Sequence, residues 1–323
     1  MASIFPDVTS GITDITKALF DLTEFMKNPG AVLWDFICGT MLSPFGKAIG
    51  GLLQTGNETF QKYANHAVEL LQKSPSEWNA DGWNAITIIN NSFIGLGASL
   101  VIIFWCIKLC SDNLDIRQTM RPETMLKEIM VLIVAEWFVC SSFTIFTSLF
   151  GLVDALTQGI SINGLEAIVV PENVLRYLLT DMDNIGVVMV NFALAFLYML
   201  ILSFSGFVIV YQAYVRMFKV MIIAPYASLV TSTIAGPHSI SHSSIAFFKY
   251  ALSTILEAVT MILVIKLGAV LFSSGLVGSE LSATVEVASM GDFWSWASRE
   301  IVLAFVMVGG IKEASIITQR ALG

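Results

Sequence analysis

Five stretches of this chain are apolar over the length that a helix needs to cross a lipid bilayer. The hydrocarbon core of a membrane is spanned by about 20 mainly apolar residues in a helix. The stretches that meet this length are 85–107, 129–153, 185–212, 246–272 and 293–311. Within lipid a single span must satisfy its backbone hydrogen bonds internally, which an α-helix does. We therefore predict an all-α, polytopic membrane protein with about five transmembrane helices.

The composition supports a membrane protein and argues against a nucleic-acid-binding protein. Hydrophobic residues make up 55% of the chain and charged residues 13%, whereas about a quarter of the residues in a soluble domain are charged. The formal net charge of −8 argues against a nucleic-acid-binding surface, because such a surface needs a basic stripe. We predict two regions: an N-terminal amphipathic and interfacial helical region at 1–83, and a polytopic transmembrane domain at 84–323.

The N-terminal region combines amphipathic patterns with an interrupted apolar segment. Residues 12–26 predict an amphipathic helix suited to a membrane surface or a partner helix. Residues 30–53 are apolar but contain Pro44 and five glycines, which predicts a broken or interfacial hairpin and leaves open whether the segment spans the membrane. Residues 58–73 repeat the amphipathic pattern. We interpret the apolar stripe of the first segment as an assembly face, formed by Ile15, Leu19, Leu22 and Met26.

The distribution of Lys and Arg predicts how the chain is oriented. Basic residues accumulate in cytoplasmic loops, and the loop 108–127 contains four of them, so we place it inside. The loop 159–184, which has a single Arg, then lies outside, and the segment with Arg216 and Lys219 lies inside again. This alternation predicts a multi-pass protein of the cell membrane with an external N-terminus and a cytoplasmic C-terminus.

A short apolar run after the third span predicts a different kind of element. The run 220–235 contains Pro225, which removes a helical hydrogen bond. If this run crossed the membrane, the loop 276–292, which has no Lys or Arg, would lie inside. We therefore predict that 214–244 is a re-entrant or surface helical hairpin on the cytoplasmic side. Broken backbone at membrane depth must be covered by protein or face water. The hairpin is therefore the predicted entrance or partner contact, with Arg216, Lys219, Pro225 and Lys249 as its candidate residues. Alternatively, the basic residues only set the topology.

Three charged residues lie inside predicted spans: Glu136, Glu257 and Lys266. A charge at the bilayer centre costs roughly 3 kcal/mol on insertion scales, so such side chains usually face a bundle interior or water. One interpretation is a polar lining or an ion pair between subunits. The other is a satisfied pair that only sets helix packing, and Lys266 can also extend to the membrane surface.

The sequence shows no catalytic or metal-binding constellation. Cys106 and Cys110, and likewise His238 and His242, have the i, i+4 spacing of paired ligands on a helix, but neither pair has a further ligand nearby in sequence. We therefore expect no metal and no cofactor. A membrane enzyme is the least favoured class of function.

The segment 214–265 carries an ordered set of features. It contains a basic turn, an Ile-Ala-Pro step, a glycine-containing loop, a lysine at the next span and a Leu-Glu-Ala step (Arg216, Lys219, 223–225, Lys249 and 256–258). In this pattern the chain resembles the polytopic inner-membrane subunit of type IV secretion systems, the TrbL/VirB-type proteins, in the form found on conjugative elements of Gram-positive bacteria. Residues 123–156 are similar to the family as well, and the resemblance covers 124–310.

The resemblance implies a non-enzymatic subunit of a membrane channel or platform for conjugative transfer. Its implied partners are membrane lipids, further copies of the chain in a homo-oligomer, other secretion subunits that include ATPases, and the translocated DNA or protein. The alternative function is a small-molecule transporter or ion channel. The charges within spans favour this alternative, and the lack of an internal repeat disfavours it, because many transporters are built from repeats.

Overall fold

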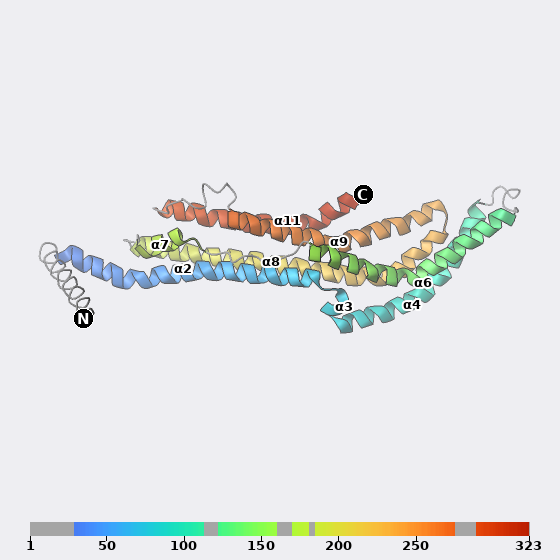
Figure 1. The fold of residues 1–323 in the computed structure, drawn as a ribbon, viewed down its shortest axis with the longest axis horizontal. Helices are drawn as coiled ribbons and strands as arrows, with labels where there is room; N and C mark the ends of the chain where they lie inside the picture. The colour runs from blue at the N-terminus through green and yellow to red at the C-terminus, as the bar shows by residue number, and fades with distance from the viewer. Residues whose placement is uncertain (1–28, 113–121, 160–169, 181–184, 275–288, 323) are drawn as a thin grey trace, which may run out of the picture. The chain divides into compact units, whose positions relative to one another are not determined.

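The computed structural model describes residues 29–112, 122–159, 170–180, 185–274 and 289–322, and they are almost entirely helical (Figure 1). No strand occurs in these ranges. The elements in chain order are α2 (Pro29–Gln72), α3 (Pro75–Trp78), α4 (Ala80–Asp112), α6 (Pro122–Gly159), α7 (Glu172–Thr180), α8 (Ile185–Thr231), the 3-10 helix η1 (Ser232–Ala235), α9 (His238–Ser274) and α11 (Met290–Leu322). The predicted all-α class is therefore confirmed.

Five of these helices are long and apolar enough to cross a membrane. They lie in α4, α6, α8 with η1, α9 and α11, and each contains one of the five predicted spans. α2 is not among them in the part of the chain that the structure describes. The chain is thus a multi-pass membrane protein.

The chain forms two compact units, and each is assembled from segments far apart in sequence. The first takes in the described parts of 1–57, 169–201 and 283–298, and the second those of 58–168, 202–282 and 299–323. The predicted regional boundary at residue 83 lies inside the second unit, which contains the end of α2 as well as α4.

The predicted interruption at 30–53 is wrong, because α2 runs as one helix from Pro29 to Gln72. Two of its glycines are explained by close packing. A Cβ on Gly50 would come within 3.0 Å of the Leu175 side chain, and one on Gly56 within 3.1 Å of the Met199 backbone. Glycine weakens a helix by about 1 kcal/mol relative to alanine, but here it lets α7 and α8 approach. Of the five glycines that indicated a break, Gly50 therefore serves a contact between helices, whereas a Cβ on Gly51 would meet nothing within 4 Å.

A polar contact and stacked rings hold the first unit together. The Tyr198 hydroxyl donates to the Asn57 side-chain oxygen at 2.7 Å, which joins α8 to α2. The Tyr198 ring stacks on Trp296 of α11, with ring centroids 5.7 Å apart. Tyr177 of α7 stacks on Phe293 at 6.4 Å.

The predicted break at Pro225 is also wrong. α8 continues through Pro225 to Thr231, and its 47 residues make it about 70 Å long, more than twice the roughly 30 Å hydrocarbon thickness. Proline removes only the hydrogen bond that its own N–H would donate to the Met221 carbonyl oxygen, four residues earlier. Beyond the proline, Ser228 donates to the Pro225 carbonyl oxygen at 3.3 Å and Ser232 to that of Leu229 at 2.6 Å, which adds hydrogen bonds to the last turns of α8.

The turn between α8 and α9 lies at η1, within the predicted hairpin 214–244. It packs against α4, α6 and α9, and fully buried Ala235 joins a cluster with Val101, Ala135 and Val139. These partners lie inside two of the spans, between the middle of each span and the end that flanks the loop 108–127. A helical hairpin therefore exists within 214–244, while its re-entrant topology stays a prediction.

The helices α9 and α11 pack antiparallel in the second unit. Residues further along α9 meet residues earlier along α11, in the pairs Thr260 with Thr318, Val264 with Gly310, and Gly268 with Met307. The two threonine hydroxyls share a hydrogen bond of 2.9 Å. This register brings the end of α11 beside the first half of α9.

Candidate functional site

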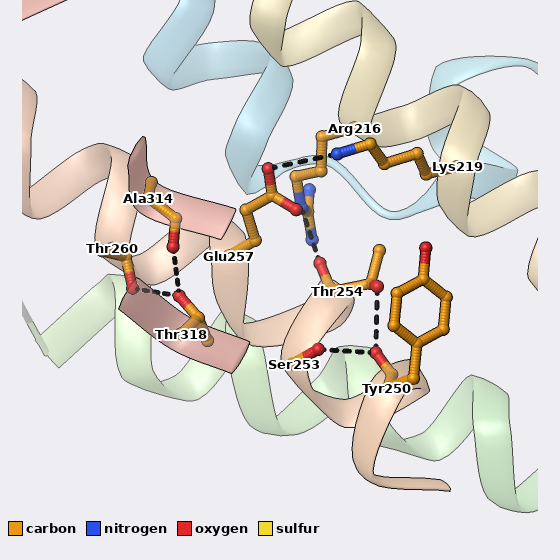
Figure 2. A network of polar contacts seen from close by, with 9 residues as sticks. All are labelled: Arg216, Lys219, Tyr250, Ser253, Thr254, Glu257, Thr260, Ala314 and Thr318. Atoms are coloured by element: carbon orange, nitrogen blue, oxygen red, sulfur yellow. Dashed lines mark hydrogen bonds and ion pairs between the residues drawn. The ribbon is translucent and has the colours of Figure 1, made fainter. Parts of the chain in front are cut away.

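A charged cluster between α8 and α9 is the most distinctive polar feature of the second unit (Figure 2). Arg216 of α8 is only 2% exposed, although it carries a guanidinium. Its Nε donates to the Thr254 carbonyl oxygen at 3.4 Å, and its Nη2 to that of Ile255 at 3.0 Å. A buried charge needs such partners, because an unpaired one is strongly unfavourable. Arg216 therefore fixes α8 to the backbone of α9.

Glu257 supplies the negative charge of the cluster. It is 5% exposed, and its Oε1 lies 3.7 Å from the Lys219 Nζ. It also attracts the Arg216 guanidinium, which lies beside it. The Lys219 side chain is 39% exposed, so the lysine forms the outer edge of the cluster. Two cations thus share one buried carboxylate.

Helical spacing explains how the four residues meet. Arg216 and Lys219 are three residues apart on α8, and Thr254 and Glu257 are three apart on α9, which places each pair on one helix face. The neighbouring hydroxyls are satisfied within α9, since Ser253 and Thr254 both donate to the Tyr250 carbonyl oxygen. The arrangement is a hydrogen-bonded and charge-paired cluster that joins α8 to α9.

This geometry corrects one predicted contact and leaves others untested. Arg216 cannot reach a partner outside the protein because it is buried and bonded to α9, so it does not belong to the predicted partner-contact set. Lys219 is partly exposed, and Lys249 lies exposed on α9, two turns before Glu257. Pro225 lies within α8. Partner contacts at these three residues stay predictions.

The other predicted polar and assembly residues do not join the cluster. Glu136 is half-buried on α6, and Lys266 is exposed on α9, about two and a half turns beyond Glu257. Of the three charges predicted within spans, only Glu257 enters this cluster. The predicted assembly face, Ile15, Leu19, Leu22 and Met26, lies outside the described residues.

A second ion pair was missed by the sequence reasoning. The Lys108 Nζ lies 2.8 Å from a Glu128 carboxylate oxygen, and both side chains are less than a fifth exposed. The Trp105 indole also donates to the Glu128 carbonyl oxygen at 3.0 Å. These contacts join the end of α4 to the start of α6. The signal was present in the charges that flank the loop 108–127, which we interpreted only as topology.

Across the described ranges, no group of three or more His, Cys, Asp or Glu side chains gathers as a metal site would require. His238 and His242 lie in the first turns of α9, although the preceding glycine and proline predicted a loop there. No protein-family model matches the chain, and neither a curated protein nor a solved structure matches it.

Proposed function

We propose that this protein is a non-enzymatic channel or platform subunit of a type IV secretion machine that transfers DNA or protein in conjugation. One observation carries the proposal furthest: the basic residues Arg216 and Lys219, which lie inside α8 and not in a turn, meet Glu257 of the Leu-Glu-Ala step in one cluster, and the resemblance rests on both features. Residues about 40 positions apart thereby acquire one shared structural role. A shared role of this kind fits a scaffold in which α8 and α9 are held together by their charges.

The charges of the cluster are bonded to one another and to the backbone, and this favours a scaffold over a small-molecule transporter. A transporter needs polar groups that bind and release a substrate near the membrane midplane. In the cluster, Arg216 instead donates to backbone carbonyls, and Glu257 lies in an ion pair. In the proposed role the chain works as a homo-oligomer in the cell membrane, beside other secretion subunits. Separate ATPases supply the energy, and the partly exposed Lys219 and the exposed Lys249 face the cytoplasmic entrance.

A deletion experiment tests the proposed function. Donor cells that lack this gene in its conjugative element are expected to lose transfer by at least about a thousandfold, and the wild-type gene supplied in trans restores it. The tagged chain is expected to co-purify with a secretion ATPase. Normal transfer from the deletion strain would contradict the proposal. If the purified chain instead moved a small solute across vesicles, the transporter alternative would replace it.

Cysteine labelling tests the proposed orientation. In a background without native cysteines, Ala321→Cys is expected to be protected from a membrane-impermeant maleimide in intact cells, and Ser279→Cys is expected to react. The physical reason is the retention of Lys- and Arg-rich segments on the cytoplasmic side. Ala321 suits this test because its side chain is exposed. Thr318, three residues earlier on the same helix, is unsuitable because it is 6% exposed and bonded to Thr260. External labelling of Ala321→Cys would overturn the orientation.

A further inference from the structure

The last four turns of α2 pack against two spans of the second unit. Gly206 of α8 marks the closest approach, since a Cβ there would lie 3.0 Å from the Tyr63 side chain and 3.2 Å from the Phe60 Cα. The Phe60 ring also packs on the Phe272 ring of α9, with ring centroids 5.5 Å apart. The backbone of α2 is therefore in direct contact with α8, and its side chains reach α9.

A second set of contacts shows the direction in which this segment runs. Beyond α2, the Trp78 ring of α3 lies 6.0 Å from the Tyr214 ring of α8. Tyr214 is two residues before Arg216, whose Nε donates to the Thr254 carbonyl oxygen of α9. The chain thus passes from the end of the apolar stretch 246–272 to a level well inside it. The segment runs lengthwise beside this span, whereas an amphipathic surface helix lies flat in the membrane interface.

The two faces of this segment differ in polarity. The face against the spans is apolar and at most 2% exposed, and it consists of Phe60, Ala64, Ala67 and Leu71. The opposite face carries polar side chains three or four residues apart, all of them exposed. We call it the α2 polar stripe, and it consists of Lys62, His66, Glu69 and Lys73.

Contacts within the stripe leave its polar groups at the surface. The Glu69 carboxylate lies 2.6 Å from the Lys73 Nζ and 3.7 Å from the His66 Nδ1. The three side chains are nevertheless between 42% and 58% exposed. Much of their hydrogen-bonding capacity is therefore directed away from the protein.

The neighbouring helices present apolar surface at the same level. Phe207 and Tyr211 lie on α8 between its contacts with Phe60 and Trp78, and both are more than half exposed. On α9, Leu267 is also more than half exposed. Large exposed apolar side chains on membrane-spanning helices mark the surface that faces lipid. This level of the second unit therefore lies in the hydrocarbon.

A charged face is unfavourable in contact with lipid at such a level. Charged side chains within the membrane face a bundle interior or water, because contact with hydrocarbon carries a large cost in free energy. The bundle interior lies on the opposite, buried face of α2. In the described part of the chain α2 is not itself apolar enough to span a membrane, although it lies along helices that are. Water is the environment that fits the stripe.

We propose that the α2 polar stripe lines an aqueous conduit enclosed by several copies of this chain. The stripe is on the outer surface of the single chain, so the water-filled space lies between copies. The proposal rests on the channel form of the proposed function and adds the surface along which a hydrophilic substrate passes. The stripe carries both signs of charge, which suits a hydrated passage more than a site that selects one ion.

The test measures how fast single cysteines react with a trimethylammonium methanethiosulfonate in native membranes that are opened to both sides. All variants lack the native cysteines. Lys62→Cys and His66→Cys are expected to react at least about a hundredfold faster than Phe207→Cys and Leu267→Cys, because the reactive thiolate forms in water and is suppressed in apolar surroundings. Full reaction of every variant in dodecyl sulfate shows that each cysteine is present.

Ala64→Cys is the matched control, because it lies on the buried face of the same helix between the two stripe positions. It is expected to react as slowly as Phe207→Cys. Fast reaction of the stripe and the lipid-facing positions alike would mean that this level lies outside the membrane, and would overturn the conduit. Slow reaction at both stripe positions would mean that protein or lipid covers the stripe, which also overturns it.

The mass of particles extracted directly from native membranes into polymer nanodiscs tests the enclosure by copies. Several copies of the chain per particle are expected, and a single copy would contradict the proposal. Neither measurement uses conjugative transfer. An unreactive stripe would therefore refute the conduit and leave the deletion experiment to decide the secretion function. Normal transfer from the deletion strain would refute the secretion function alone.

Discussion

Replacing Glu257 with glutamine is expected to destabilise the protein by about 3 kcal/mol, because removal of one partner from a buried ion pair leaves the other charge uncompensated. The substitution keeps the size of the side chain and removes only its charge. It leaves the Arg216 guanidinium, which is 2% exposed, and the Lys219 ammonium without the carboxylate that they share. The measurement is unfolding in mixed micelles, followed by circular dichroism.

Two matched variants test whether the burial of Glu257 causes the expected loss of stability. Glu136→Gln makes the same change at a half-buried position of another span and is expected to have an effect below about 1 kcal/mol. Lys219→Gln removes the more exposed cation and is expected to change stability by about 0.5 kcal/mol, as partly exposed pairs do. If Glu257→Gln were no more harmful than Glu136→Gln, the cluster would not stabilise the fold.

A double-mutant cycle separates the shared interaction from local packing. Once Glu257→Gln is present, Arg216→Met removes a charge that already lacks its counter-ion, so its effect should be smaller than in the wild-type protein. We expect a coupling of at least about 1 kcal/mol between the two positions. Strictly additive effects would mean that Arg216 is stabilised by the α9 carbonyls alone.

Substitution of Gly97 by valine is expected to displace the α8–α9 turn from α4. A Cβ at this position would lie 2.9 Å from the Ser228 carbonyl oxygen and 3.0 Å from a Val139 methyl group. The closer obstacle is backbone, which cannot rotate away as a side chain does. Overpacking of this kind costs about 1 to 3 kcal/mol, and the expected result is a lower midpoint of thermal unfolding with faster proteolysis between α8 and α9.

Gly95 provides the control for this experiment. It lies on the same helix two residues earlier, and a Cβ there meets nothing within 4 Å. Gly95→Val changes helix propensity by the same amount as Gly97→Val, so the difference between the two variants isolates the steric contact. Equal stability of both variants would contradict the close approach of α8 to α4.

The local pattern of the sequence was sufficient for the class of the fold. A membrane span can be recognised in a sequence as about 20 consecutive apolar residues. All five helices long and apolar enough to cross a membrane were therefore predicted without structural information. Pro225 and the glycines of α2 misled the prediction of helix boundaries for one shared reason. The effect of such a residue on a helix depends on the tertiary packing around it, as at Gly50, where a Cβ would come within 3.0 Å of the Leu175 side chain.

Which charges belong together was decided only by tertiary structure. The sequence showed Arg216, Lys219 and Glu257 as separate signals, two for topology and one for a polar span. It held no information on the register of α8 against α9, because apolar helix faces pack in more than one register. Packing between helices placed the guanidinium against the Thr254 and Ile255 carbonyls and brought Gln319 across from Lys249. The sequence alone therefore determined a helical membrane protein with five spans, and the contacts between distant helices determined where its charges are satisfied.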